Sequence, residues 1–262
     1  MTDYLFDHLY QISEKVNKTD EIFLFLDYDG TLVSFKNKPQ DVVTTKEVKT
    51  VVSDLLQNEN IKVVIVTGRT LSEIKKLLDI EGLSYAALHG LHIQLSNGTS
   101  YKWKSSNNLR KILTNIRNLS EKKFQHEKEI YLEDKKFTLA FHYRMLSNEK
   151  IKDVVDSFIE IVKSEDTGNK LDILHGSKVI EIKPVGWNKG KAVELISSYI
   201  TSKNTLAMYI GDDITDEDAF HYLNNQGITI FVSNKKNRPS AAQYWLRDPD
   251  EVLHFLKSLK SK

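Results

Sequence analysis

Two carboxylic acids, two positions apart, stand directly after an apolar run near the start of the chain. Residues 22–26 are all apolar, and Asp27, Asp29 and Gly30 follow them. Side chains at positions i and i+2 of extended backbone point the same way, so we expect the carboxylates of Asp27 and Asp29 to lie side by side. An acidic turn with glycine in a left-handed conformation is the alternative, and it would carry no chemistry.

A second acidic pair weakens the turn interpretation. Asp212 and Asp213 follow another largely apolar run, at 206–210. Carboxylates gathered in one place repel one another, which raises their pKa values, and a hard cation with oxygen ligands relieves that repulsion. The sequence has no cysteine, and no histidines near these aspartates are spaced as a ligand pair, which disfavours zinc. The pattern therefore predicts a Mg²⁺ site.

Aspartates around a metal ion can support phosphoryl transfer. A carboxylate such as Asp27 can attack phosphorus and form an aspartyl-phosphate, and its neighbour Asp29 can protonate the leaving alcohol and later activate water. The phosphate oxygens then need cations and hydrogen-bond donors, which the Thr67 hydroxyl, the Gly68 amide and the Lys189 ammonium could supply. A helix N-cap at Thr67 and a solvated lysine at the start of a helix are the alternatives for these positions.

The candidate residues stand at the ends of apolar runs that alternate with helical patterns. Apolar runs without polar alternation are typical of strands buried on both faces of a parallel sheet, and ligands bind at the carboxyl ends of such strands. The sequence therefore predicts an α/β fold with a parallel sheet. We expect strands at 22–26, 63–66, 85–88, 206–210 and 228–232, and helices at 4–16, 46–57, 71–78, 191–199, from about Asp216, and after Asp250.

The alternation is interrupted between residues 105 and 183. There, each of two helical patterns is followed by two strand-like runs, which predicts an inserted α+β domain with one antiparallel sheet and two helices on one face. The core then comprises residues 1–104 and 184–262, and the insertion 105–183. Within the insertion we expect helices at about 109–124 and 150–163, and strands at 130–132, 137–143, 171–174 and 178–182.

Composition excludes several classes of function. The 262 residues carry 37 Lys and Arg against 36 Asp and Glu, a formal charge of +1, so a polyanion-binding surface is not expected and nucleic acid is not a predicted partner. No apolar run approaches the ~20 residues of a membrane helix, and the N-terminus does not resemble a signal peptide. We therefore expect a cytoplasmic protein without membrane contact.

Four short motifs, in this order, resemble those of the haloacid dehalogenase-type (HAD) phosphotransferases. They are Asp-Tyr-Asp-Gly-Thr-Leu at 27–32, Thr-Gly-Arg at 67–69, Lys189, and Gly-Asp-Asp at 211–213. The resemblance implies a Rossmann-like core, with Asp27 as nucleophile, Asp29 as general acid and base, and Thr67 and Lys189 as phosphate ligands. It also implies Mg²⁺ held by Asp27, the Asp29 carbonyl and Asp212, and supported by Asp213 or Asp216.

Further segments resemble the trehalose-6-phosphate phosphatases within that superfamily. They include Leu-His-Gly at 88–90, Phe-His-Tyr-Arg at 141–144, Val-Ile-Glu-Ile-Lys-Pro at 179–184 and Gly-Asp-Asp-Ile-Thr-Asp-Glu-Asp at 211–218. This resemblance implies a phosphoric monoester hydrolase (EC 3.1.3.12) that acts in trehalose biosynthesis on a small sugar phosphate. It implies that the insertion is a cap, or lid, that closes over the sugar, and that a trehalose-6-phosphate synthase is a conceivable partner.

Several polar residues are candidates for binding the sugar phosphate. Carboxylates and fixed cations suit the hydroxyls of a disaccharide, and the pairs Glu133 with Lys135 and Glu181 with Lys183 have the spacing that shares one sheet face. Surface ion pairs, each contributing less than ~1 kcal/mol, are the alternative. The predicted substrate-binding residues are Gly68, Arg69, His89, Glu133, Lys135, Arg144, Glu181 and Lys183.

Other interpretations remain open at this point. His89 could be a structural hydrogen-bonding residue, and Trp103 and Trp187 could pack at the hinges of the insertion rather than stack on a sugar. His92 stands where similar sequences commonly carry an acidic residue, so another substrate, such as sucrose 6-phosphate or a mannosyl- or glucosyl-3-phosphoglycerate, is the main alternative. A non-catalytic sugar-phosphate sensor or synthase partner is a further alternative.

Overall fold

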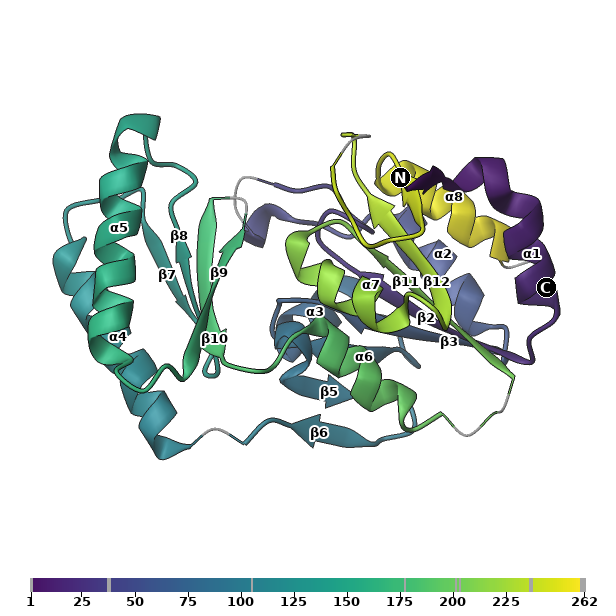
Figure 1. Ribbon diagram of the computed structural model, residues 1–262, viewed down its shortest axis with the longest axis horizontal. Coiled ribbons are helices and arrows are strands. Elements are labelled where there is room, and N and C mark those ends of the chain that lie inside the picture. Colours follow the sequence, from purple (N-terminus) through teal and green to yellow (C-terminus); the bar gives the residue numbers. More distant parts are fainter. Residues whose placement is uncertain are drawn as a thin grey trace. The chain divides into compact units, whose positions relative to one another are not determined.

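The computed structural model describes residues 2–36, 39–104, 106–176, 178–200, 202, 204–235 and 238–259. The chain divides into two compact units, Met1–Lys102 with Asn188–Lys262, and Trp103–Trp187. Ser105, the predicted first residue of the insertion, lies outside the described residues. Each unit is built around its own sheet (Figure 1). That the second unit serves as a lid stays a prediction.

Among the described residues, the first unit contains a nine-stranded sheet in the order β1-β13-β12-β11-β2-β3-β4-β5-β6. Neighbouring strands from β1 to β4 in this order are parallel, whereas β5 and β6 are antiparallel additions at one edge. The strands are β1 (Asp3–Tyr4), β2 (Glu21–Asp27), β3 (Ile61–Val66), β4 (Ser84–Ala87), β5 (His92–Gln94), β6 (Ser100–Lys102), β11 (Thr205–Gly211), β12 (Gly227–Val232) and β13 (Tyr244–Leu246).

Helices cover both faces of this sheet, as the apolar runs predict. In β2, Leu24 and Leu26 belong to one buried cluster and Phe25 to another, because successive strand residues point to opposite faces. Figure 1 shows α6 and α7 in front of the sheet and α2 behind it. The helices are α1 (Leu9–Asn17), α2 (Lys46–Leu56), α3 (Leu71–Leu78), α6 (Lys189–Ser197), α7 (Glu217–Leu223) and α8 (Pro249–Leu259), with 3₁₀ turns η1 (Leu5–His8), η2 (Pro39–Asp41), η3 (Leu88–Gly90) and η4 (Ile214–Asp216).

The N-terminal prediction of one helix over 4–16 is wrong in its first turn. Asp3 and Tyr4 form the short strand β1, which pairs with β13, and the α-helix begins only at Leu9. The hydroxyl of Tyr4 donates to Glu251 at 2.7 Å, so a distant part of the chain fixes this segment. Strands of two or three residues, such as β1, β5, β6 and β13, are too short to produce a clear period of their own.

The second unit is an antiparallel sheet with helices on one face (Figure 1). Leu132, Phe141 and Ile180 form one cross-strand row and pack into the core shared with the helices. The next row, Glu133, Ala140 and Glu181, therefore points to the opposite face. The α/β class with an α+β insertion is confirmed. The elements are α4 (Asn107–Lys123), α5 (Asn148–Glu165), β7 (Tyr131–Asp134), β8 (Leu139–His142), β9 (Leu171–Gly176) and β10 (Val179–Pro184), in the strand order β7-β8-β10-β9.

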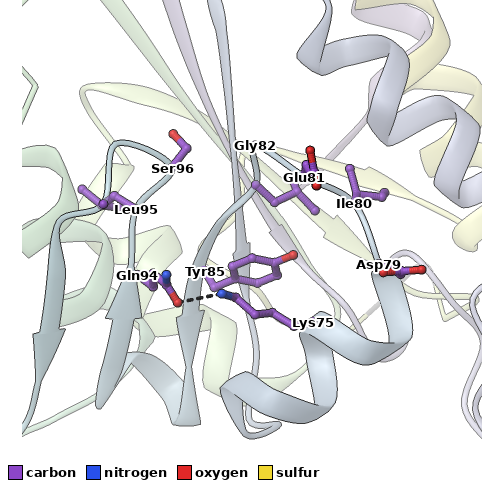
Figure 2. A pocket seen from close by; sticks show the side chains of 11 residues that line it. Lys75, Asp79, Ile80, Glu81, Gly82, Tyr85, Gln94, Leu95 and Ser96 are labelled. Atoms are coloured by element: carbon purple, nitrogen blue, oxygen red, sulfur yellow. Dashed lines mark hydrogen bonds between the residues drawn. The ribbon is translucent and has the colours of Figure 1, made fainter.

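A cavity of about 350 Å³ lies beside the first residues of β4, where the loop from α3 enters the sheet. Lys75 donates to the side-chain oxygen of Gln94 at 2.8 Å and lies over the ring of Tyr85 (Figure 2). The described residues that line the cavity include none of those predicted to bind phosphate or metal. Of the helices that the structure describes, none is long and apolar enough to cross a membrane.

Candidate active site

Asp27 ends the central strand β2 and is almost completely buried, with 4 % of its surface exposed. The ammonium of Lys189, the first residue of α6, donates to Asp27 Oδ1 at 2.6 Å and to Asp216 Oδ1 at 2.7 Å. Asn188 caps this helix by accepting from the amide of Lys191. Lys189 is only 3 % exposed, so the alternative of a solvated lysine at a helix start does not hold.

Asp216 organises the loop that follows β11. Its Oδ2 accepts hydrogen bonds from the backbone amides of Asp212 and Asp213, at 3.1 and 2.9 Å. Its Oδ1 accepts from Lys189 and, at 2.6 Å, from the hydroxyl of Tyr209. Both oxygens are thus engaged by the protein. The side chain of Asp213 turns to the amide of Ile214, at 2.8 Å, and caps the 3₁₀ turn η4; its part in binding a metal stays a prediction.

Tyr209 belongs to this site but was not among the residues predicted from the sequence. It is fully buried in β11, and its hydroxyl reaches the same Asp216 oxygen that binds Lys189. Burial and the nearby charges of Asp216 and Asp27 raise its pKa well above the usual value, so the phenol stays protonated and acts as a donor. A tyrosine in an otherwise aliphatic strand next to an acidic motif was the only signal in the sequence.

Lys189 alone does not offset the cost of ionising all the carboxyl groups of this site. Burial is the main cause that raises the pKa of Asp27 to about 7, and the charge of Asp216 adds to it while Lys189 opposes both. Burial, followed by the charges of Asp27 and Asp216, raises the pKa of Asp212 well above its usual range. An added cation would favour the ionised forms of both groups.

The donor set at this point fits a hard divalent cation. Asp27, Asp212 and Asp216 each offer a carboxylate oxygen, and these oxygens lie within 4.8 Å of one another. Gly30 has a φ of +92°, and a Cβ at that position would lie 2.2 Å from Asp212 Oδ2. Only glycine therefore lets the backbone after Asp29 approach the carboxylate of Asp212 so closely. Oxygen ligands of this kind suit Mg²⁺.

The carboxylate of Asp29 is bound by Arg69 and not by Lys189. The guanidinium of Arg69 donates from Nε and Nη2 to the two Asp29 oxygens, at 2.7 and 2.6 Å, and it lies 5.5 Å from the ring centre of Tyr28. This two-pronged geometry fixes the orientation of the carboxylate. Arg69 is one of the predicted substrate-binding residues, and no pattern in the sequence indicates its pairing with Asp29.

Thr67, Gly68 and His89 lie together beyond the carboxyl ends of β3 and β4. The Thr67 hydroxyl accepts from the Arg69 amide at 3.1 Å, whereas Thr70 is the residue that caps α3, so the N-cap alternative for Thr67 does not hold. A Cβ on Gly68 would come within 2.8 Å of His89 Nε2. His89 is buried and has a positive φ of 56°, and its amide donates to the Thr67 carbonyl.

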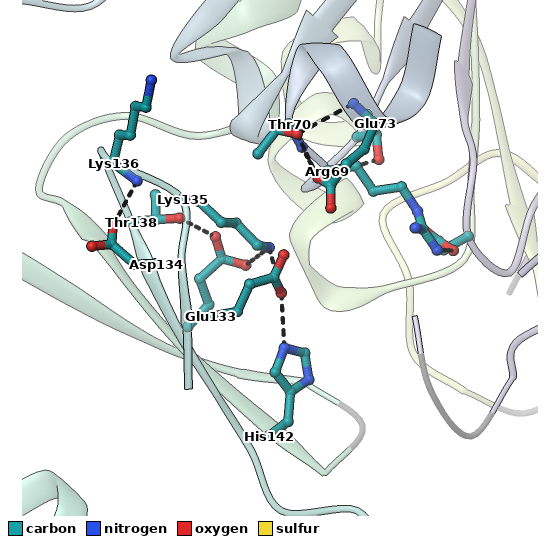
Figure 3. A network of polar contacts seen from close by, with 12 residues as sticks. Arg69, Thr70, Glu73, Glu133, Asp134, Lys135, Lys136, Thr138 and His142 are labelled. Atoms are coloured by element: carbon teal, nitrogen blue, oxygen red, sulfur yellow. Dashed lines mark hydrogen bonds and ion pairs between the residues drawn. The ribbon is translucent and has the colours of Figure 1, made fainter. Parts of the chain in front are cut away.

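In the second unit, three of the predicted sugar-binding residues form one polar network on the face of the sheet opposite the helices (Figure 3). The ammonium of Lys135 lies 3.9 Å from Glu133 Oε2 and 3.4 Å from Glu181 Oε2. Thr138 donates to the other Glu181 oxygen at 2.7 Å, and His142 Nε2 lies 3.0 Å from Glu133 Oε2. Neither Thr138 nor His142 was singled out as a site residue from the sequence.

The other two predicted sugar-binding residues of this unit are Lys183 and Arg144. Lys183 is buried and contacts the Trp187 carbonyl and, at 3.4 Å, the Asp172 carboxylate. Arg144 lies in the turn after β8. Trp103 packs edge-on against Phe137, with ring centres 6.3 Å apart, which favours the packing interpretation for that tryptophan. The roles of Lys183 and Arg144 in binding substrate stay predictions.

Comparison with known proteins places this architecture in a family. The family model described as trehalose-phosphatase matches residues 25–250, which spans both compact units. The chain belongs to the trehalose-phosphatase family. The family and the enzyme class predicted from the motifs, a phosphoric monoester hydrolase, are thereby confirmed.

Individual members of the trehalose-phosphatase family resemble the chain along most of its length. It is 33 % identical over 257 residues to trehalose-phosphate phosphatase B of Arabidopsis thaliana, covering 92 % of this chain and 67 % of the relative. It is 31 % identical over 263 residues to trehalose 6-phosphate phosphatase RA3 of Zea mays, covering 94 % and 71 %. The C-terminal domain of a C. albicans trehalose-6-phosphate phosphatase has the same fold, with a TM-score of 0.85 at 18 % identity and coverage of 100 % and 98 %.

Proposed function

We propose that the protein hydrolyses trehalose 6-phosphate to trehalose and phosphate through an aspartyl-phosphate on Asp27. The observation that carries the proposal is the buried Asp27 at the end of β2, bound by Lys189 and close to Asp212. Membership of the trehalose-phosphatase family supports the choice of substrate. A buried carboxylate beside a fixed ammonium is suited to attack a phosphoryl group, provided that a cation also offsets the negative charges of the phosphoryl group and of the second carboxylate.

The proposed reaction has two steps that Asp27 and Asp29 share. An Asp27 oxygen forms a bond to phosphorus while the bond from phosphorus to the sugar oxygen breaks. Asp29, which must first exchange its ion pair with Arg69 for a proton, gives that proton to the departing oxygen. Water then attacks the aspartyl-phosphate, Asp29 takes a proton from it, and the Asp27 carboxylate is restored as phosphate leaves. Lys189 and the Gly68 amide would stabilise charge on the phosphoryl oxygens.

Asp27, Asp212 and the backbone carbonyl of Asp29 would hold Mg²⁺ in this reaction. Bound there, it would neutralise charge on the transferred phosphoryl group. Asp216 contributes by holding Lys189 and the amides of Asp212 and Asp213, since its two oxygens are occupied by those contacts.

Chelation tests the metal directly. We expect phosphate release to fall to background when divalent cations are removed with EDTA, and to return when Mg²⁺ is added in excess. We also expect Mg²⁺ to raise the melting temperature, because a cation that binds only the folded chain stabilises it. Phosphate release that continues undiminished in the chelated protein would contradict the metal assignment.

A panel of sugar phosphates tests the substrate. With Mg²⁺ present, we expect kcat/KM for trehalose 6-phosphate to exceed that for glucose 6-phosphate and sucrose 6-phosphate by at least about tenfold. A smaller or differently linked sugar cannot reach all the groups that bind the hydroxyls of trehalose, so it loses some of those hydrogen bonds. The panel also includes a mannosyl- or glucosyl-3-phosphoglycerate, because His92 stands where similar sequences commonly carry an acidic residue and another substrate is therefore the main alternative. Equal rates on trehalose 6-phosphate and glucose 6-phosphate would refute the substrate proposal.

A further inference from the structure

The polar face of the second unit contains a contact whose role the proposed reaction does not explain. His142 on β8 and Tyr131 on β7 are direct cross-strand neighbours, and their rings stack with centres 5.6 Å apart at 28°. The stacking fixes one side of the imidazole. From that position Nε2 reaches Glu133 Oε2 at 3.0 Å.

The geometry points to His142 as a positioning residue for Glu133, an inference that rests on the proposed trehalose 6-phosphate activity. A glutamate has three side-chain torsions to fix before it can accept a hydroxyl in one direction. The imidazole on one side and Lys135 on the other both approach Oε2 of Glu133, which leaves Oε1 for a hydroxyl of the sugar. His142 thus acts on the substrate through Glu133 and need not touch the sugar itself.

The electrostatic surroundings of Glu133 agree with this geometry. Burial would raise its pKa, but the hydrogen bond from His142 and the charge of Lys135 outweigh burial and the repulsion from Glu181, so the pKa lies below its usual value. The carboxylate is therefore held ionised as an acceptor. A histidine that served only to pack β8 against β7 would have no effect on how Glu133 binds a ligand.

Substitutions at His142 separate the hydrogen bond from the ring. His142→Phe keeps a ring beside Tyr131 but removes the donor, whereas His142→Gln keeps an N–H donor near the place of Nε2. We expect KM for trehalose 6-phosphate to rise about tenfold in His142→Phe, with kcat changed less, and to return most of the way in His142→Gln. His175→Phe is the matched control: His175 is exposed on the edge strand β9 and pairs with Ile180, whose row points to the other face of the sheet.

A double-mutant cycle with Glu133→Gln decides between positioning and packing. If His142 works through Glu133, His142→Phe adds less than about a twofold rise in KM once Glu133 is replaced. Independent, multiplicative effects of the two substitutions on KM, or a His142→Phe protein with unchanged KM, would overturn the inference. If the wild-type protein itself did not hydrolyse trehalose 6-phosphate, the proposed function would be overturned instead.

A second measurement needs no substrate, so the inference is tested whatever the activity shows. The pKa of the Glu133 carboxyl, followed by NMR, is expected to rise in His142→Phe and to stay unchanged in His175→Phe. The groups facing Glu133 are His142, Lys135 and Glu181, and only the first is altered. A Glu133 pKa that is the same with and without His142 would show that the contact does not hold the carboxylate.

Discussion

Replacing Asp27 with asparagine is expected to lower phosphate release by at least about 10³-fold, because an amide cannot replace the carboxylate that forms the bond to phosphorus. Asparagine has nearly the same shape and still accepts a hydrogen bond from Lys189, so the fold should persist. Steady-state release from trehalose 6-phosphate measures the effect, and circular dichroism verifies that the variant is folded.

Asp20→Asn is the matched control for that substitution. Asp20 precedes β2, so it lies at the opposite end of the same strand, and its side chain is exposed. We expect this variant to retain the wild-type rate. If Asp27→Asn also retained the wild-type rate, the assignment of the nucleophile would be wrong. If neither the wild-type protein nor Asp20→Asn hydrolysed any sugar phosphate, the alternative of a non-catalytic sensor would be favoured.

Lys189→Met is expected to remove activity and to destabilise the fold by about 3–5 kcal/mol, the usual cost of leaving buried charge without its partner. Lys189 is the ammonium that both Asp27 and Asp216 share. Urea unfolding followed by circular dichroism gives the free energy of unfolding. Lys191→Met is the control, since Lys191 on the same helix forms only a half-exposed pair with Glu194.

The loss of stability in Lys189→Met should depend on pH in a defined direction. The pKa of Asp27 is already raised to about 7 in the folded protein, and it must rise further without Lys189. A carboxyl group whose pKa is raised by folding binds its proton more tightly in the folded state. Its destabilising effect on the fold is therefore absent below the unfolded pKa, grows as pH rises from there, and is complete above the folded pKa. The difference between variant and wild type should therefore shrink as pH falls from 8 towards about 7, because below that pH Asp27 is protonated in both folded proteins. A difference that grew on acidification would contradict the buried-charge account.

The parallel core could be predicted from the sequence because burial on both faces leaves a plain pattern. The run at 22–26 has no polar alternation, and its residues pack into clusters on both sides of the sheet. The acidic residues come directly after such runs, so their convergence at one edge followed from the topology alone. Asp27, Lys189 and Asp212 are close together for this reason.

Side-chain pairings could not be predicted, because they depend on register and rotamer rather than on sequence spacing. Arg69 and Asp29 are 40 residues apart and form a two-pronged ion pair. His142 faces Glu133 only because β7 and β8 pair in one particular register. Tyr209 reaches Asp216 through a turn that the two amide hydrogen bonds of Asp216 shape. None of these contacts has a periodic signature.

The central claim is that trehalose 6-phosphate transfers its phosphoryl group to Asp27. Mixing the Mg²⁺-loaded protein with trehalose 6-phosphate, quenching in acid within a turnover and mapping peptides by mass spectrometry tests it directly. The account predicts one added phosphoryl group on the peptide that contains Asp27, absent from the Asp27→Asn protein and less abundant when glucose 6-phosphate is the substrate. A phosphoryl group found on another residue, or equal labelling by both sugar phosphates, would contradict it.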